Sequence, residues 1–446
     1  MGRGRAIAVA VSVLASSLGA CAAEDDTSTV EYTAAEWAKI SALGPLPELP
    51  ADPTNRYADS ADAAKFGQRL FFDTGYGGPV EVEGPSGKVG EAGKVACVTC
   101  HHTNYYYVDE RKPANVSHGV NWTARNSPSL VNVAFYKWFS WAGKQDSLWM
   151  QGANGNESVD NFHGTRLHYA HVVFEKYRLA YDSLFPVPLD PALDPAAADK
   201  DRFPPAGKPK ASADAADGPW EMMAPGDRAI VNTILANCGK SIAAFERKLI
   251  SRGSAFEQFL KTKSGLPPAA KRGLRLFVGA AACDACHKGP TLTDDDFHAT
   301  GVPQMIGEHV PAMDMGRFDD VPKLLGNTFN TRGEFSDDRV AGMMKLAPVE
   351  ASKGDETLRG RFRTKSLVQV GETAPYMHNG SMATLEDVVH FYNLGGGPAG
   401  SFAGTKDPRI VPLHLSDADE KDLVAFLKTL TGLPPPAELA QDTSVK

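Results

Sequence analysis

The sequence has little basic charge and no long apolar run in the body of the chain. Its 46 lysines and arginines are outnumbered by 54 aspartates and glutamates, which leaves a net charge of −8. A phosphate-binding surface needs a basic excess, so this balance argues against nucleic acid as a partner. Beyond the N-terminal segment, no apolar run reaches the roughly 18 residues of a transmembrane helix. The 446 residues are enough for two or three domains.

The N-terminus has the pattern of an export signal. Two arginines precede an apolar run that ends in Leu18-Gly19-Ala20-Cys21. This ending favours a lipoprotein-type signal over residues 1–21, with a plain secretory signal as the alternative. Both signals lead to an oxidising compartment. We therefore expect a protein of the periplasm or cell envelope that meets the membrane only through a lipid anchor at Cys21. Residues 22–54 are interpreted as a linker.

Cysteine is scarce, and four of the six residues follow one pattern. Two segments read C-x-x-C-H: Cys97-Val-Thr-Cys100-His101 and Cys283-Asp-Ala-Cys286-His287. This is the attachment signature of c-type haem, in which two thiols form thioethers with the haem vinyl groups and the histidine lies under the iron. One copy alone could be a zinc half-site or a redox dithiol. Two copies in an exported chain predict two covalently bound haems. The remaining Cys238 is expected to be a small core residue.

An internal repeat surrounds the two signatures. Residues 64–71 and 270–277 both read A-K-x-G-x-R-L-F, and the halves close with similar segments, IAAFERKL at 242–249 and LVAFLKTL at 423–430. Their apolar residues recur at helical spacing. The sequence therefore predicts an all-α fold with two c-type cytochrome domains, irregular haem-wrapping loops and an internal repeat.

The domain boundaries follow from the repeat and from composition. We expect an N-terminal haem domain over 55–252, a C-terminal haem domain over 264–434 and a tail over 435–446. The stretch 186–220 is rich in Pro, Ala and Asp. Such a composition cannot bury a core, so we expect an exposed excursion from the first domain.

Four further segments resemble those of the bacterial di-haem cytochrome c peroxidases, and within them the MauG-like branch. The segments are RNSPSLVNVAF at 125–135, NCGKSIAAFERKLISR at 237–252, CDACHKGPTLTDDDFHATGVP at 283–303 and TAPYMHNGSMATLEDVVHFYNLGG at 373–396. The resemblance covers roughly residues 55–432. It implies an N-terminal haem that reacts with hydrogen peroxide and a C-terminal haem that receives electrons from a small donor, a cytochrome c or a cupredoxin.

The resemblance also implies axial ligands for the two irons beyond His101 and His287. Where the family's peroxidases have a methionine at the C-terminal haem, this chain has Tyr392, the MauG-like arrangement. Tyrosine is a known haem ligand. If Tyr392 only packs, Met377 or Met382 is the alternative. His118 matches the distal histidine of the N-terminal haem, with a solvated loop histidine as the alternative.

Two other family features have matching residues here. Trp141 matches a tryptophan between the haems that is suited to electron hopping, and core packing is the alternative. Asn126, Thr373 and Pro375 match a Ca²⁺ site between the domains, where an amide and two backbone carbonyls supply hard oxygen donors. The alternative for Asn126 is an N-cap or turn role, and for the other two an ordinary loop.

The peroxide pocket departs from the family pattern. Its glutamine matches Gln151, but the glutamate that moves the peroxide proton is replaced by Asn161. Cleavage of the O–O bond needs a base that takes and returns a proton, which asparagine cannot do. Glu157, Asp160 or His163 from the same loop could substitute.

Three functions remain open at this point. The first is an exported di-haem oxidoreductase that reduces hydrogen peroxide with electrons from a small periplasmic donor. The second is MauG-like, peroxide-dependent oxidation of an aromatic side chain on a partner protein, which Tyr392 favours. The third is an electron-transfer cytochrome with a decayed peroxide site, which Asn161 favours.

Overall fold

The structure is a computed structural model and describes residues 30–445 except 111–115, 306–309 and 311. Within these ranges helices dominate, and the two short strands pair antiparallel. The bounds are α1 Ala34–Ser41, α2 Ala61–Phe72, α3 Leu148–Gly155, α4 Arg166–Leu184, α5 Pro219–Met222, α6 Pro225–Glu246, α7 Ala255–Thr262, α8 Pro268–Val278, α9 Arg317–Leu325, α10 Arg339–Ala351, α11 Leu385–Asn393, α12 Asp417–Lys428, β1 Phe297–His298 and β2 Phe362–Arg363.

A crossing of α2 and α6 forms the centre of the first core. Gly67 lies at the crossing, where a Cβ atom would be only 1.9 Å from the backbone oxygen of Ser241. A larger residue would force the helices apart. Phe71 of α2 and Phe245 of α6 pack beside it, with ring centroids 5.1 Å apart. The glycine of the A-K-x-G-x-R-L-F motif is thus required by helix packing.

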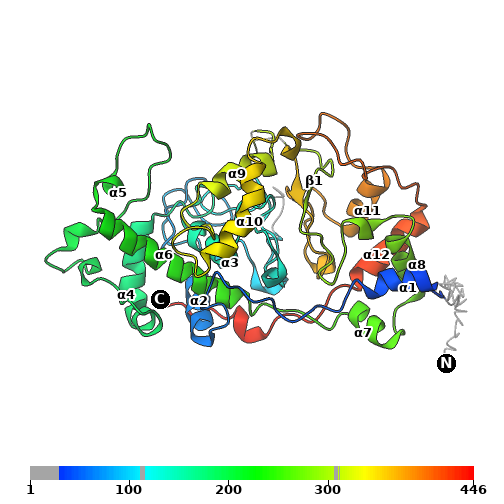
Figure 1. Cartoon of the computed structure of the whole chain (residues 1–446), viewed down its shortest axis with the longest axis horizontal. Coiled ribbons are helices and arrows are strands. Elements are labelled where there is room, and N and C mark those ends of the chain that lie inside the picture. The colour runs from blue at the N-terminus through cyan, green and yellow to red at the C-terminus, as the bar shows by residue number, and fades with distance from the viewer. Residues whose placement is uncertain (1–29, 111–115, 306–309, 311, 446) are drawn as a thin grey trace, which may run out of the picture.

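The second half repeats this crossing with α8 and α12. A Cβ at Gly273 would lie 1.9 Å from the backbone oxygen of Asp422, and Phe277 packs against Phe426 at 5.1 Å. In Figure 1 the two crossings lie in separate lobes, α2 and α6 on the left and α8 and α12 on the right. The predicted all-α fold with an internal repeat is confirmed.

One segment of the second half packs against the first core. Helices α9 and α10 contribute Val321, Leu324, Leu346 and Val349 to the hydrophobic cluster that contains α2 and α6, and Figure 1 shows both helices above α3 in that view. A partly buried ion pair adds to this contact, since Arg125 binds the buried Asp320 at 2.6 Å. The two lobes are therefore joined by a shared core and a partly buried ion pair.

Both terminal segments also cross between the lobes. The segment after α1 and the tail after α12 run along the lower edge of Figure 1. Backbone oxygens of the first segment accept hydrogen bonds from Arg252, with Leu46 at 2.5 Å. In the tail, the backbone oxygen of Glu438 accepts a hydrogen bond from Gln68 of α2 at 2.8 Å. These two segments tie the halves together on one side.

The stretch 186–220 differs from the expectation that it buries no core. Leu189, Leu193, Phe203 and Trp220 are each 5% exposed or less and belong to the first hydrophobic cluster. The ring of His171 on α4 helps hold the stretch, with Nδ1 2.9 Å from the backbone oxygen of Leu193. The average composition of the stretch does not predict this packing, because a few well-spaced apolar side chains are enough to anchor a polar segment to the core.

The described ranges contain no helix that is both long and apolar enough to span a bilayer. The predicted signal segment and Cys21 lie outside the described residues. The first element within them, α1, packs through Ile40 into the hydrophobic cluster of the second lobe.

Candidate functional site: two haem-attachment loops

The first attachment loop follows α2 and begins with a short 3₁₀ turn, Cys97–Thr99. The His101 imidazole has its Nδ1 3.0 Å from the backbone oxygen of Tyr107, so Nδ1–H donates there. Because Nδ1 carries the proton, Nε2 is the ring nitrogen with a lone pair, the arrangement in which histidine binds a metal. Burial lowers the pKa of His101 to about 4, which keeps the ring neutral as a ligand must be.

The second attachment loop has the same geometry after α8. Its 3₁₀ turn spans Cys283–Ala285, and the Nδ1 of His287 donates to the backbone oxygen of Leu292 at 3.1 Å. Burial also lowers the pKa of His287. Within the described ranges all five cysteines are free of disulfides. Both loops therefore offer two thiols and one oriented neutral imidazole, which fits covalently attached haem c.

A cavity that is partly open to solvent lies beside the first loop. It is lined by Cys97, Cys100 and His101 together with Gln151 and Asn161. Gln151 comes from α3, and Asn161 comes from the loop that follows it. The structure thus brings these two predicted pocket residues to the same space as the first attachment loop, where a haem and a small substrate need room.

Two of the three suggested substitutes for the missing glutamate are paired elsewhere, and none of the three reaches the cavity. Glu157 binds Arg166 at 2.6 Å, and the Arg166 guanidinium lies over the Trp220 ring at 4.9 Å. His163 pairs with Glu81 at the surface. Glu157, Asp160 and His163 are all absent from the residues that line the cavity. Within the described ranges their loop therefore supplies no carboxylate or imidazole to this space.

The cavity contains a carboxyl group that the sequence analysis missed. Glu246, the last residue of α6, lines it and is 2% exposed. Burial raises the pKa of Glu246 to about 8. The available signal was its position in IAAFE, four residues after Ile242 and so on the same helical face, where apolar residues are expected. Tyr76 and Tyr169 also line the cavity.

Tyr392 lies at the second attachment loop. It is held by α11, whose N-terminus is capped by the Thr384 side chain. Burial raises the pKa of Tyr392 to about 12, and the sulfurs of Cys286 and Cys283 are close enough to add to the rise, while the nearby Thr300 side chain opposes it. The tyrosine is therefore within reach of a haem held by these cysteines. Met377 and Met382, the alternatives, are half-buried on either side of a tight loop.

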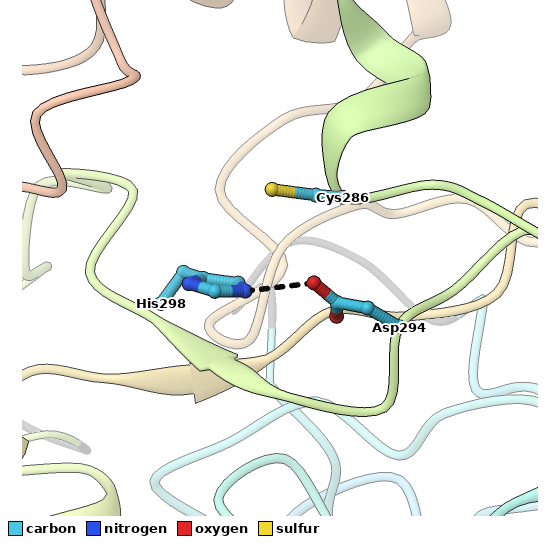
Figure 2. Close-up of side chains that lie close together, drawn as sticks. All are labelled: Cys286, Asp294 and His298. Atoms are coloured by element: carbon cyan, nitrogen blue, oxygen red, sulfur yellow. Dashed lines mark hydrogen bonds and ion pairs between the residues drawn. The ribbon is translucent and has the colours of Figure 1, made fainter.

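A charged cluster surrounds Cys286. Figure 2 shows His298 and Asp294 beside this cysteine, with the ligand atoms of all three within 4.8 Å of one another. His298 lies between two carboxylates, with Nε2 3.0 Å from Asp294 and Nδ1 3.0 Å from Asp407. A thioether to haem leaves the Cys286 sulfur a poor ligand for a second metal. We therefore interpret the cluster as the polar surroundings of the second haem.

His118, the expected distal ligand, is buried and does not have the solvated position of the alternative. It is 1% exposed, and its Nε2 donates to the backbone oxygen of Val82 at 3.0 Å. The ring packs edge-on against Trp122, and His118 does not line the cavity. Its backbone oxygen approaches the attachment loop and lies 3.6 Å from the Cys100 sulfur. Ligation of iron by His118 stays a prediction.

Trp141 and the predicted calcium ligands form one neighbourhood between the lobes. The Trp141 indole donates to the backbone oxygen of Asn126 at 2.7 Å. The Asn126 amide nitrogen lies 3.2 Å from the backbone oxygen of Pro375, and both residues are buried. Thr373 precedes Pro375 by two residues and is half-buried. The structure therefore brings Trp141, Asn126 and Pro375 together.

Comparison with known proteins extends these observations to nearly the whole chain. Residues 61–265 match the family described as di-haem cytochrome c peroxidase. A cytochrome c peroxidase of Denitromonas iodatirespirans, IdrP1, is 31% identical over 438 residues, which cover 97% of this chain and 94% of the relative. The methylamine utilization protein MauG of Methylorubrum extorquens is 26% identical, with 95% and 92% covered.

Solved structures agree with the fold. A MauG-like protein associated with microbial copper homeostasis superimposes with a TM-score of 0.60 at 23% identity, covering 89% of this chain and 98% of that one. The di-haem peroxidase BthA of Burkholderia thailandensis gives 0.57 at 20% identity, with 86% and 89% covered. Taken with the two haem-attachment loops, these matches show that the chain belongs to the di-haem cytochrome c peroxidase family, whose members are oxidoreductases with two haem c groups.

Proposed function

We propose that this protein reduces hydrogen peroxide at its N-terminal haem, with electrons that enter at its C-terminal haem from a small donor protein, a cytochrome c or a cupredoxin. The observation that carries the proposal is the cavity beside the first attachment loop, which joins Cys97, Cys100 and His101 to Gln151 and Glu246. The second loop has Tyr392 at its cysteines instead.

The residues of the first site have separable tasks. Bound haem c supplies an iron that exchanges electrons with peroxide. The Gln151 amide offers a hydrogen bond that orients peroxide in the cavity. Asn161 has its Oδ1 3.0 Å from the Ser158 hydroxyl, which donates to it, so its amide nitrogen is the group left for the substrate. Neither amide exchanges a proton near neutral pH, which leaves proton transfer to another group.

Steady-state turnover tests the proposal. The purified di-haem protein is mixed with a pre-reduced small cytochrome c or cupredoxin, and peroxide-dependent oxidation of the donor is followed by absorbance. We expect two donor electrons to be consumed for each peroxide. A variant with His101→Gly, which keeps both cysteines, should lose this activity. Absence of turnover with every reduced donor, although both haems are present, would contradict the proposal.

A second candidate is peroxide-dependent oxidation of an aromatic side chain on a partner protein, and Tyr392 favours it. A phenolate is an anionic donor that stabilises oxidised iron, which suits storage of oxidising equivalents more than acceptance of electrons. Co-purified or co-expressed partner proteins are examined for a mass change that requires peroxide. If neither activity is found and the haems still exchange electrons, the protein is an electron-transfer cytochrome.

A calcium ion between the lobes is part of the proposal. The 3.2 Å approach of the Asn126 amide to the Pro375 oxygen supports it. A half-turn of the amide would bring its oxygen there, and two hard oxygen donors suit Ca²⁺. The Thr373 backbone oxygen would be a third ligand. Chelation and Asn126→Ala should both slow electron transfer between the haems without loss of either haem. If stopped-flow spectra show an unchanged transfer rate after calcium removal, the site has no role in it.

The proposal also covers the limits of the two haem domains and the location of the protein in the cell. We propose haem domains over 55–252 and 264–434 and a periplasmic or cell-envelope location, with a lipid on Cys21. The repeated helix crossings at Gly67 and Gly273 support one domain in each half, and the export pattern of residues 1–21 supports the location. Mass spectrometry of the processed N-terminus tests the anchor, because a free N-terminus downstream of Cys21 would contradict it.

A further inference from the structure

A buried carboxyl group faces the cavity of the first site from the last turn of α6. The Glu246 Oε2 atom has no hydrogen-bond partner within the described residues. Glu246 follows Ile242 by one helical turn, and both line the cavity. Ile242 packs against α3, since a Cβ at Gly152 would lie 3.2 Å from the Ile242 Cβ. The carboxyl group therefore lies on the face of α6 that is turned toward the helix carrying Gln151.

An unpaired carboxyl group is costly in a buried position unless it stays protonated or meets a ligand. The cations at this end of α6 do not compensate it. Lys240 binds Asp337 at 2.6 Å, and Arg247 binds Asp59 at 2.8 Å. Burial alone raises the pKa of Glu246 to about 8, a value at which both protonation states are accessible under working conditions.

The other titratable groups of the cavity are unsuited to proton exchange. Burial raises the pKa values of Tyr76 and Tyr169 well above the usual tyrosine range. The Cys97 and Cys100 thiols are consumed by haem attachment, and the imidazole of His101 is committed to the iron and to Tyr107. Within the described lining, Glu246 is the group that can take up and release a proton near neutral pH.

We propose that Glu246 moves the peroxide proton in the first haem site, the task for which Asn161 lacks a carboxylate. The inference rests on the proposed peroxide reduction. The Glu246 carboxylate takes the proton from one peroxide oxygen and returns it to the other, the O–O bond breaks, and the protonated oxygen leaves as water. Two donor electrons and two protons from solvent convert the remaining oxygen to the second water, so that Glu246 ends in its starting state.

The test compares Glu246→Gln with the wild type in the pre-steady-state reaction with peroxide. We expect the variant to react slower by about 10²- to 10⁴-fold, the usual contribution of a positioned proton-transfer group. Since the carboxylate is the form that acts, the wild-type rate should rise about tenfold between pH 7 and pH 9 and then level off. The Gln variant should be flat in this range, and Glu246→Asp should recover part of the rate. Glu175→Gln, on the exposed face of α4, is the matched control.

A second readout is independent of activity. The folded pKa of Glu246 is raised above the value of about 4.3 in the unfolded chain, so the folded state holds an extra proton between these pH values. Wild-type stability should therefore fall as the pH rises toward 8, and Glu246→Gln should remove this part of the fall. Urea midpoints measured with both haems bound would show it, with Glu175→Gln behaving as wild type.

The outcomes separate the two proposals. If wild-type protein with both haems never reacts with peroxide, the proposed function fails and the role of Glu246 fails with it. If wild type reacts and Glu246→Gln reacts equally fast, only the role of Glu246 is overturned. A wild-type rate that is flat from pH 6 to pH 9 overturns it as well, even if the Gln variant does not fold.

Discussion

The two haem sites have the same attachment geometry and different surroundings. Each has a 3₁₀ turn that carries the cysteines and a histidine whose Nδ1 donates to a backbone oxygen five or six residues later. The first site opens into a cavity with Gln151, Asn161 and Glu246. The second has Tyr392 and a charged cluster around Cys286 instead. The two halves therefore attach haem in the same way. The residues around each attachment loop decide which reaction its haem can carry out.

The difference arises from segments outside the repeat. The repeated parts are the helix crossings at Gly67 and Gly273 and the attachment loops. Gln151 and Asn161 come from α3 and its following loop, and α9 and α10 from the other half cover this region. A repeated scaffold with non-repeated insertions thus allows one half to admit a substrate while the other surrounds its haem with protein side chains.

The largest difference between the two sites is expected when one haem at a time is removed. Intact wild-type protein should exceed its processed chain by the mass of two haems, and each Cys→Ala pair should remove one. Loss of Cys97 and Cys100 should abolish reaction with peroxide, because the substrate cavity belongs to that loop. Loss of Cys283 and Cys286 should abolish turnover with the donor and leave the first haem in place. Denaturing mass spectrometry measures the number of haems bound by the wild type and by each variant. A mass that indicates disulfides or zinc would contradict the haem assignment.

A carboxylate at position 161 should increase the reactivity of the first site toward peroxide and leave the second site unchanged. Asn161→Glu should speed the reaction with peroxide by up to about 10²- to 10⁴-fold at neutral pH, because the cavity gains a second carboxyl group while Glu246 is mostly protonated there. Stopped-flow rates at pH 7 measure the gain, with Asn161→Gln as the control that adds length without a base. A wild-type rate that is already fast, with no gain in the variant, would show that the proton path does not need position 161.

The helix crossings test whether the two halves are equivalent as scaffolds. Gly67→Ala and Gly273→Ala should each destabilise the protein by about 1–3 kcal/mol or more, because the new Cβ would meet a backbone oxygen 1.9 Å away. Chemical unfolding of the haem-loaded protein measures the loss. Gly90→Ala is the control, because nothing lies within 4 Å of its Cβ position; its positive φ of 86° adds a local strain that does not involve the helices. Near-zero losses at both crossings would contradict the close packing.

Tyr392→Phe is the mildest change and should affect one site only. If the tyrosine binds the C-terminal iron, the ferric wild type should lack the near-infrared band of a His–Met haem. Loss of the phenolate should raise the potential of that haem, since the anionic ligand favours ferric iron. The spectrum of the first haem should stay unchanged. A His–Met band in the wild type would instead assign Met377 or Met382 as the ligand.

Much of the fold and of the haem chemistry could be predicted from local sequence. The C-x-x-C-H spacing places two thiols and an imidazole on one short turn, so chain neighbours alone determine the attachment site. The A-K-x-G-x-R-L-F repeat indicated the helices, and the structure adds that its glycine is needed for the crossing. The exposed character of 186–220 was only partly predictable, because four apolar side chains dock it onto the first core.

The surroundings of the haems were decided by the tertiary structure. Sequence alone predicted two haems in two helical halves. The resemblance to the family added the prediction of a tyrosine at the second haem and showed that position 161 lacks the glutamate of the peroxide pocket. The sequence could not determine that Glu157 is bound by Arg166, or that Glu246 ends α6 at the cavity. The ion pair joins residues only nine positions apart but forms only when the loop after α3 folds against α4. The place of Glu246 depends on packing between α6 and α3, which lie dozens of residues apart along the chain. Burial and partnership set the protonation state of a carboxyl group, and only the folded chain establishes them.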